Sequence, residues 1–532
     1  MFIKNKNQSI LLATNILLVF FLILLSNLHV LPLHFGDFAF FAILTLALAL
    51  YRPGWSFLFF VGTIMLEQVN LAPLELGIAI RPYQFFGGLT ILAIIIRALT
   101  NRLNFKLAKV AWYDFLIILI GVSSFVSIAN SQIKDVSLKQ SVILASFIFL
   151  YFLVRNFLQT AEDIKKVIPF FLSSSVIVML YGIWQNVRFL HNLSNFEVMP
   201  GRPNATFTEA DWLGIFLVLL LAVTYSLIYF FHNNDDETIS NFKSKISNQI
   251  QITKNQILKT FLYIVLILDF ISLILTVSRS AWLGALAVTF IFLFTIFTNL
   301  KLNFKEWQWR KTIAIKIPIV IAIILSIAIV YIFHLTNFQL FNRAQSTGSG
   351  LQKITISCQD DQQLPDAIND TSELEKFGCR HINLEEIEGE QLSGNIGKEI
   401  YRKDPNIGVR SEIYRKSWEL IKAHPILGIG WGSISTYLGT DERGAGLNAS
   451  NLFLEVWLAT GILGLLALLV VWVLILLKAV QDFIFAKDAV KILPLFIILG
   501  WFALTVPNLF NSGILLGFIW LFLAVAAINN KK

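Results

Sequence analysis

Charged side chains are scarce in this sequence. Asp, Glu, Lys and Arg make up 14% of the 532 residues, whereas hydrophobic residues make up 56%, and the mean hydropathy is +0.70. This balance excludes a water-soluble domain, and repeated apolar runs of about 20 residues indicate transmembrane helices. The net charge of +8 therefore indicates basic loops on the cytoplasmic side of a membrane, and no nucleic acid is expected as a partner.

Cysteine is also scarce, which limits the chemistry of the chain. No Cys/His spacing resembles a zinc site, and no glycine-rich loop has a nucleotide-binding pattern, so neither a metal nor another cofactor is expected. The two cysteines, Cys358 and Cys379, both lie in a segment that the charge pattern places outside the cytoplasm. Such a compartment permits disulfides, so we expect these two residues to form one.

The apolar runs predict an all-α polytopic membrane protein with about 12–14 transmembrane helices. The candidate spans are roughly 10–30, 38–51, 55–67, 84–97, 113–129, 141–155, 167–187, 211–231, 260–276, 281–298, 312–333, 452–477, 490–506 and 513–528.

Lysine and arginine predict the orientation of these spans. With the N-terminus in the cytoplasm, the inside segments contain twenty-four of these residues and the short outside segments contain six. This asymmetry favours cytoplasmic placement of both termini. Residues 1–333 would then form the first eleven membrane helices, residues 334–451 a large extracytoplasmic loop, and residues 452–532 the last three membrane helices.

The large loop divides by composition. Acidic residues outnumber basic ones in an insert over residues 344–400, which would form either a small ordered subdomain or a flexible lid. Residues 401–443 have helical, amphipathic periodicity. That helix would lie on the bilayer surface or pack on its own domain, and the sequence does not distinguish the two.

Three arginines lie beside predicted spans on the outside. Arg202 lies in a rigid Pro-Gly-Arg-Pro turn, Arg279 at the tip of a hairpin, and Arg410 at the start of the amphipathic helix. Arginine makes forked contacts with phosphate, so this set suits an anionic ligand, although such residues also snorkel towards lipid headgroups. Asp211 starts a span, where the ordinary role of a carboxylate is to stabilise the helix N-terminus.

A polar stretch before the last three spans contains further candidates. His424 ends the amphipathic helix, where an imidazolium suits the helix dipole, and that role is favoured over catalysis. A glycine-rich turn follows. Asn451 opens a long apolar helix, and Glu455 lies one turn further on the same face. Glu455 is a candidate base or acceptor-orienting group, and capping or packing roles are alternatives.

Four stretches of the sequence are informative together: GRPNATFTEADWLG, LTVSRSAWLGAL, RSEIYRKSWELIKAHPILGIGWG and NASNLFLEVWLATGILGLL. They resemble the O-antigen ligase/polymerase family, whose members are membrane glycosyltransferases that use undecaprenyl-pyrophosphate-linked sugars. They occur in the family's order between Arg202 and Leu466, and the large outside loop precedes the last three spans, as the family layout requires.

The resemblance implies a function. Arg279 and Arg410, joined by Arg202, would bind the donor pyrophosphate, while an acceptor hydroxyl attacks the anomeric carbon without a metal. In the ligases a histidine before the asparagine is the usual candidate base, but Ser450 stands there in this chain. A serine hydroxyl is a poor base without help, so the polymerase-like side is favoured.

The resemblance also implies partners and a location. Expected partners are a polyprenyl-pyrophosphate-linked glycan, an acceptor glycan or lipid, membrane lipids and other polysaccharide-assembly proteins, for example in exopolysaccharide biosynthesis. Ser450, Asn451, His424 and Arg202 are candidate substrate-binding residues, and Arg279, Arg410 and Glu455 are candidate catalytic ones. The expected location is the inner (plasma) membrane of a bacterium.

Two alternatives remain open. One is a flippase for lipid-linked oligosaccharides or a polysaccharide transporter, since about fourteen spans suit such proteins. Against it, no two-half internal repeat is visible, and a flippase does not need a large outside loop. The other is an inactive relative that binds glycan or lipid, which the serine at position 450 keeps open.

Overall fold

The computed structural model describes residues 7–194, 196–198, 201–240, 245–301, 304–335, 351–360, 364–369, 371–382, 387–403, 405–440, 446–486 and 490–528. The chain divides into two compact units. The first comprises Met1–Thr336 and Leu420–Lys532, and the second comprises Asn337–Glu419. Each unit is described by itself.

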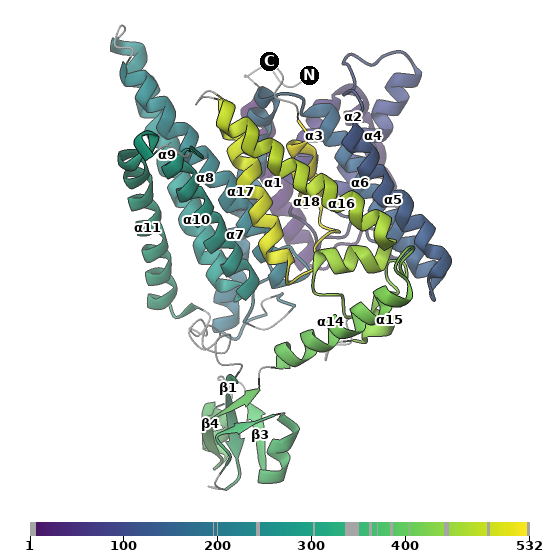
Figure 1. Cartoon of the computed structure of the whole chain (residues 1–532), viewed down its shortest axis with the longest axis vertical. Coiled ribbons are helices and arrows are strands. Elements are labelled where there is room, and N and C mark those ends of the chain that lie inside the picture. Colours follow the sequence, from purple (N-terminus) through teal and green to yellow (C-terminus); the bar gives the residue numbers. More distant parts are fainter. Residues whose placement is uncertain are drawn as a thin grey trace. The chain divides into compact units, whose positions relative to one another are not determined.

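The first unit is a bundle of apolar helices (Figure 1). Within the described residues, ten helices are long and apolar enough to cross a membrane, and four shorter apolar helices accompany them. This confirms the predicted all-α polytopic class. The long helices are α1 (Gln8–Asn27), α4 (Pro82–Leu99), α5 (Trp112–Ser127), α6 (Lys134–Phe157), α7 (Ala161–Leu190), α8 (Ala210–Ser240), α9 (Lys245–Leu275), α10 (Arg279–Thr298), α11 (Trp309–Ile332) and α16 (Leu452–Phe485). The shorter ones are α2 (Phe35–Tyr51), α3 (Pro53–Gly62), α17 (Ile492–Asn508) and α18 (Gly517–Ala526).

Two helices are shorter than the apolar runs predict, and one buried carboxylate lies between them. The predicted span 55–67 is helical only as far as Gly62, and the span 513–528 becomes helical at Gly517. Glu67, in the irregular segment after α3, accepts a hydrogen bond from the backbone N–H of Gly517 at 2.7 Å. Its carboxylate also pairs with Arg81 at 2.9 Å and accepts from the hydroxyl of Tyr83 at 2.9 Å. The buried charge is therefore paired and hydrogen-bonded, as a buried carboxylate requires.

Helix α8 is the most enclosed of the spanning helices. In the most apolar 18-residue stretch of α8, 89% of the residues are buried. Apolar side chains on all sides of this helix therefore pack against neighbouring helices. It packs against α9, α10 and α17, which lie beside it in Figure 1. Close packing of α10 on its neighbours requires a glycine, because a Cβ at Gly284 would lie 2.6 Å from the Cγ of Pro507. This arrangement places the starts of α8 and α10 near the end of α17.

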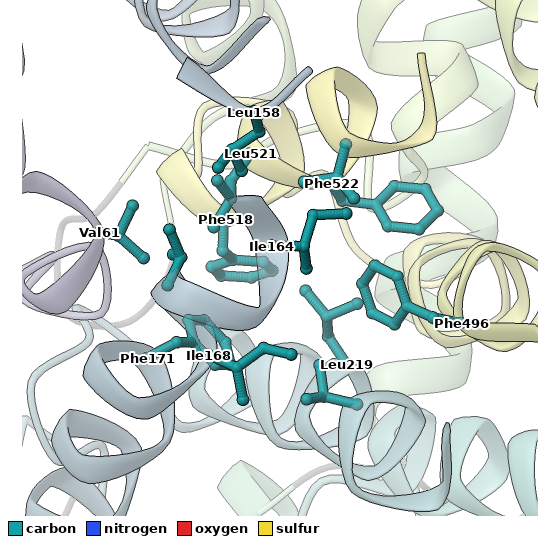
Figure 2. A pocket seen from close by; sticks show the side chains of 13 residues that line it. Val61, Leu158, Ile164, Ile168, Phe171, Leu219, Phe496, Phe518, Leu521 and Phe522 are labelled. Atoms are coloured by element: carbon teal, nitrogen blue, oxygen red, sulfur yellow. The ribbon is translucent and has the colours of Figure 1, made fainter. Parts of the chain in front are cut away.

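An apolar cavity lies within the bundle (Figure 2). It has a volume of about 70 Å³ and is lined by side chains from α3, α7, α8, α17 and α18 and by the residue after α6. No described lining residue carries a polar side chain. The lining residues are Val61, Leu158, Ile164, Val167, Ile168, Phe171, Leu219, Val223, Phe496, Phe518, Leu521, Phe522 and Val525.

The second unit contains a four-stranded sheet of order β2-β4-β1-β3. The strands are β1 (Leu351–Cys358), β2 (Ala367–Ile368), β3 (Cys379–Ile382) and β4 (Ile396–Lys403); helix α13 (Ile387–Leu392) lies between β3 and β4 in the sequence. The alternating Ile354 and Ile356 of β1 enter a small apolar core with Ile400. The described residues of the acidic insert thus form strands with a small apolar core of their own. Cys358 and Cys379 are directly paired across β1 and β3 and form a disulfide.

The predicted amphipathic helix is α14 (Pro405–Ala423). Its polar face is covered by ion pairs of Arg415 with Glu412 at 2.6 Å and with Glu419 at 2.8 Å, which is the spacing that brings side chains together on a helix. Trp418 on this helix is 47% exposed. The helix ends one residue before His424, as the sequence predicts.

Candidate functional site

The turn around Arg202 packs on the hairpin between α9 and α10. The Nε of Arg202 donates to the backbone carbonyl of Thr276 at 3.1 Å, and its guanidinium pairs with Asp211 at 3.3 Å. Asp211, in the first turn of α8, also accepts a hydrogen bond from the hydroxyl of Ser278. Asp211, which we expected only to stabilise the start of α8, therefore also connects the turn that carries Arg202 with the hairpin that carries Ser278.

Small residues allow this junction to be tight. A Cβ at Gly214, one turn into α8, would lie 2.6 Å from the Cβ of Ala281 on α10, closer than packed carbon atoms approach. Arg279 is the first residue of α10 and is half-buried. Next to it, Ser280 accepts a hydrogen bond from the side-chain amide of Asn511 at 2.9 Å, which connects the hairpin to the segment between α17 and α18.

The glycine-rich turn after α14 docks on a break in α16. Gly461 has φ 71° and ψ −172° within α16, so the helical hydrogen bonds are interrupted there. The freed carbonyl of Leu458 accepts from the N–H of Ile429 at 2.7 Å, and the freed N–H of Ile462 donates to the carbonyl of Pro425 at 3.1 Å. Because an unpaired backbone group is costly in a membrane, the turn and the break stabilise each other.

The same turn positions a tryptophan. Trp431 lies between Gly430 and Gly432, whose φ angles of 84° and 75° place both in the left-handed region that glycine tolerates. The carbonyl of Trp431 accepts from the hydroxyl of Ser137 at 2.6 Å, which anchors the turn to α6. Trp431 is only 3% exposed, and its indole N–H has no acceptor among the described residues.

A polar cavity of about 210 Å³ lies beside this turn. It is bounded by the start of α8, the start of α16, the turn itself and the segment between α17 and α18. None of its described lining residues is a lysine, arginine or histidine. They are Gln140, Trp212, Trp431, Gly432, Ile434, Ser435, Gly446, Leu447, Asn448, Glu455, Ser512, Gly513, Ile514, Leu515 and Leu516.

Glu455 is the one ionisable group among the described residues that line this cavity. Its side chain is largely buried, and one carboxylate oxygen accepts from the backbone N–H of Ala449 at 2.7 Å. Within the described part of the chain no hydrogen-bond donor reaches the second oxygen. One carboxylate oxygen is thus fixed by the backbone, and the second can accept a proton, which is the arrangement that a general base requires.

The residues just before α16 have structural contacts. Asn451 caps α16: its side-chain oxygen accepts from the N–H groups of Phe453 and Leu454, and its amide donates to the carbonyl of Leu509 at 3.0 Å. Ser450 has φ 49°, and its N–H donates to the side chain of Asn448. Neither Ser450 nor Asn451 is a described lining residue of the cavity.

The remaining predicted residues lie elsewhere. His424 directly follows α14, and its backbone N–H donates to Leu420 and its carbonyl accepts from Gly428, as expected for a helix end. Arg410 is half-buried on the part of α14 that belongs to the second unit. Sequence reasoning missed Trp431, Trp212 and Gln140 as lining residues; the only signal was the two glycines that flank Trp431.

The fold and the cavity define an integral membrane protein with a buried polar site at its helix ends. Residues 264–469 match the family model described as O-Antigen ligase. The match covers less than half of the chain, but it includes Arg279, Arg410 and Glu455. It confirms the resemblance found in the sequence: this part of the chain is similar to the O-antigen ligase family. No curated protein matches the chain significantly.

Proposed function

We propose that this chain transfers or polymerises a polyprenyl-pyrophosphate-linked glycan at the outer face of a bacterial inner membrane, without a metal. The family match supports a membrane glycosyltransferase of the O-antigen ligase/polymerase type. The polymerase-like side is favoured because Ser450 stands where the ligases carry a histidine.

The observation that carries this proposal is the juxtaposition of two chemically different sites at the start of α8. Asp211 pairs with the guanidinium of Arg202 beside the hairpin that carries Arg279. The next residue, Trp212, lines the cavity that contains Glu455. Cationic groups and a carboxylate thus border one another, which is what transfer from a pyrophosphate to a hydroxyl needs.

The reaction follows from these roles. The Glu455 carboxylate accepts the proton of an acceptor hydroxyl, whose oxygen attacks the anomeric carbon of the donor sugar. The bond between that carbon and the pyrophosphate oxygen breaks, and its electron pair stays on the pyrophosphate. Arg279 and Arg410 stabilise the charge that develops there through forked hydrogen bonds, and Arg202 supports the same anion.

The glycans of cells that lack this chain test the proposal. Lipid-linked repeat units that remain short would identify a polymerase. Full-length polymer left on its lipid carrier would identify a ligase. Unchanged glycans, with the chain shown to be expressed in the parent strain, would contradict both.

The proposed orientation has a separate test. Both termini and the segment from Phe231 to Thr260 are proposed to be cytoplasmic, because lysine and arginine gather on those segments. A cysteine introduced at position 247 should resist an impermeant thiol reagent in intact cells and react after permeabilisation. Labelling in intact cells would contradict this topology.

A further inference from the structure

We propose that the polar cavity beside Glu455 is the subsite for the terminal sugar of the acceptor, and that it takes one uncharged pyranose ring. This inference rests on the proposed glycosyl transfer and adds a substrate class for one specific part of the site. It assigns Trp431 and Gln140 as residues that determine the acceptor.

The charge of the cavity excludes the pyrophosphate. None of its described lining residues is cationic, and one of them is the carboxylate of Glu455. Among the described residues, an anion placed there would find no counter-charge, and the carboxylate would repel it. Arg202 contacts Asp211 and the hairpin that carries Arg279, and neither arginine is a described lining residue of the cavity.

The hydrogen-bonding groups of the cavity suit the hydroxyls of a sugar. The indole N–H of Trp431 has neither an acceptor among the described residues nor accessible surface of its own. We expect the indole ring to turn towards the cavity when a sugar hydroxyl can accept from it, because an unpaired buried donor costs free energy. Amides of Gln140 and Asn448 and hydroxyls of Ser435 and Ser512 line the same space. Hydroxyls both donate and accept, so a pyranose complements this mixture.

Aromatic groups complete the complementarity. Trp212 and Trp431 both line the cavity, and aromatic side chains combine a large apolar surface with a polar edge. A pyranose ring has the same dual character, with C–H groups on its faces and hydroxyls at its edge. The described residues that line the apolar cavity of Figure 2 include aromatic rings but no polar side chain, so a sugar there would find no side-chain partner for its hydroxyls.

The position of Glu455 assigns the cavity to the acceptor rather than to the donor. A base must reach the hydroxyl that attacks, so the ring that carries this hydroxyl must lie beside the carboxylate. The donor is bound through its anionic end, which requires the arginines. The two substrates would then meet at the start of α8, where Asp211 contacts Arg202 and the next residue, Trp212, lines the cavity.

Binding without a donor tests the subsite directly. The purified full chain would be examined by saturation-transfer NMR with a panel of methyl hexopyranosides and methyl N-acetylhexosaminides. At least one should bind to the wild-type chain. Trp431→Phe, which keeps a ring and removes the N–H, and Gln140→Ala should each weaken that binding about 10-fold. The matched control is Trp184→Phe, because Trp184 lies on α7, is 41% exposed and is not a described lining residue.

Kinetics then separates this inference from the proposed function. In a transfer assay, Trp431→Phe should raise the KM for the acceptor about 10-fold and leave the KM for the donor unchanged. A raised donor KM instead would make the cavity a donor site and overturn the inference. Unchanged KM values in both Trp431→Phe and Gln140→Ala would overturn it too, with the transferase function intact.

Two further outcomes are informative. If the wild-type chain binds sugars through this cavity but transfers none, the proposed function fails and the sugar subsite stands. If no sugar of the panel binds and the variants do not alter transfer, the subsite is wrong. Should Trp431→Phe reduce the folded yield, Gln140→Ala alone decides, because Gln140 is half-buried and can be shortened without losing a core side chain.

Discussion

The polar cavity beside Glu455 and the apolar cavity of Figure 2 both include residues of α8, but only the first has polar side chains in its described lining. Trp212 of α8 lines the polar cavity, whereas Leu219 and Val223 of α8 line the apolar cavity of Figure 2. The 7 to 11 residues between them correspond to roughly 10–17 Å along a helix. Polar chemistry in this region is thus placed at helix ends, where loops and broken backbone supply hydrogen-bonding groups, while the helix interior contributes only packing.

The largest expected effect comes from replacing the glycine at the break in α16. In Gly461→Ala the new Cβ would lie 1.9 Å from the carbonyl oxygen of Ile426, at a φ that disfavours any side chain. We expect loss of most folded protein, because the docked turn cannot shift without unpairing backbone groups. Detergent-solubilised yield and size-exclusion profiles measure this.

A matched control exists for that substitution. A Cβ added at Gly88 in α4 would meet no atom within 4 Å, so Gly88→Ala should leave the yield unchanged. Normal yield and normal activity in Gly461→Ala would show that the interlock between the turn and α16 is dispensable.

The next effect concerns the two sides of the proposed reaction. Glu455→Gln, Arg279→Lys and Arg410→Lys should each lower kcat by about 100- to 1000-fold, or roughly 3–4 kcal/mol, with normal abundance of the protein. A lysine retains the charge but loses the forked geometry. If both lysine variants assembled normal glycan, the arginines would serve lipid headgroups or neighbouring carboxylates and the pyrophosphate site would be wrong.

Removal of the disulfide should act on the second unit and spare the polar cavity. Replacing Cys358 and Cys379, which are 21 residues apart, with serine should lower the stability of that unit by about 3 kcal/mol on the chain-entropy account. Differential scanning fluorimetry with and without reductant would detect the change, and transfer activity should persist. A double variant with unchanged melting would indicate that the small apolar core suffices.

The smallest effect is expected in the apolar cavity. Val223→Ile adds one methylene beside a space of about 70 Å³, which should stabilise the bundle by at most about 1 kcal/mol or leave its stability unchanged. Activity should not change, as measured by the same transfer assay. A strong loss of activity would show that this cavity holds a substrate chain, and the contrast between the two cavities would fail.

The sequence was informative where a signal repeats along the chain. Apolar runs of span length predicted the membrane helices, and the polar residue before an apolar run predicted that a long helix opens at Asn451. It was uninformative where single residues from distant segments meet. Gln140, Trp212 and Trp431 line one cavity, but no local sequence pattern connects them. Glu67 bonds the backbone of Gly517 at the start of α18, which is 450 residues away in the sequence. The hydrogen bonds between the break at Gly461 and the glycine-rich turn are likewise tertiary contacts, and the spacing of apolar residues does not predict them.

The break at Gly461 also bears on the order of events during biosynthesis. The segment that satisfies it, residues 425–429, precedes α16 in the chain but can reach it only once α16 has entered the membrane. Until then an unbroken helix is the form in which every backbone group of α16 is paired. We therefore expect α16 to be inserted as a continuous helix and to open at Gly461 when the turn docks, so that completion of the polar cavity is a late step in the maturation of the protein.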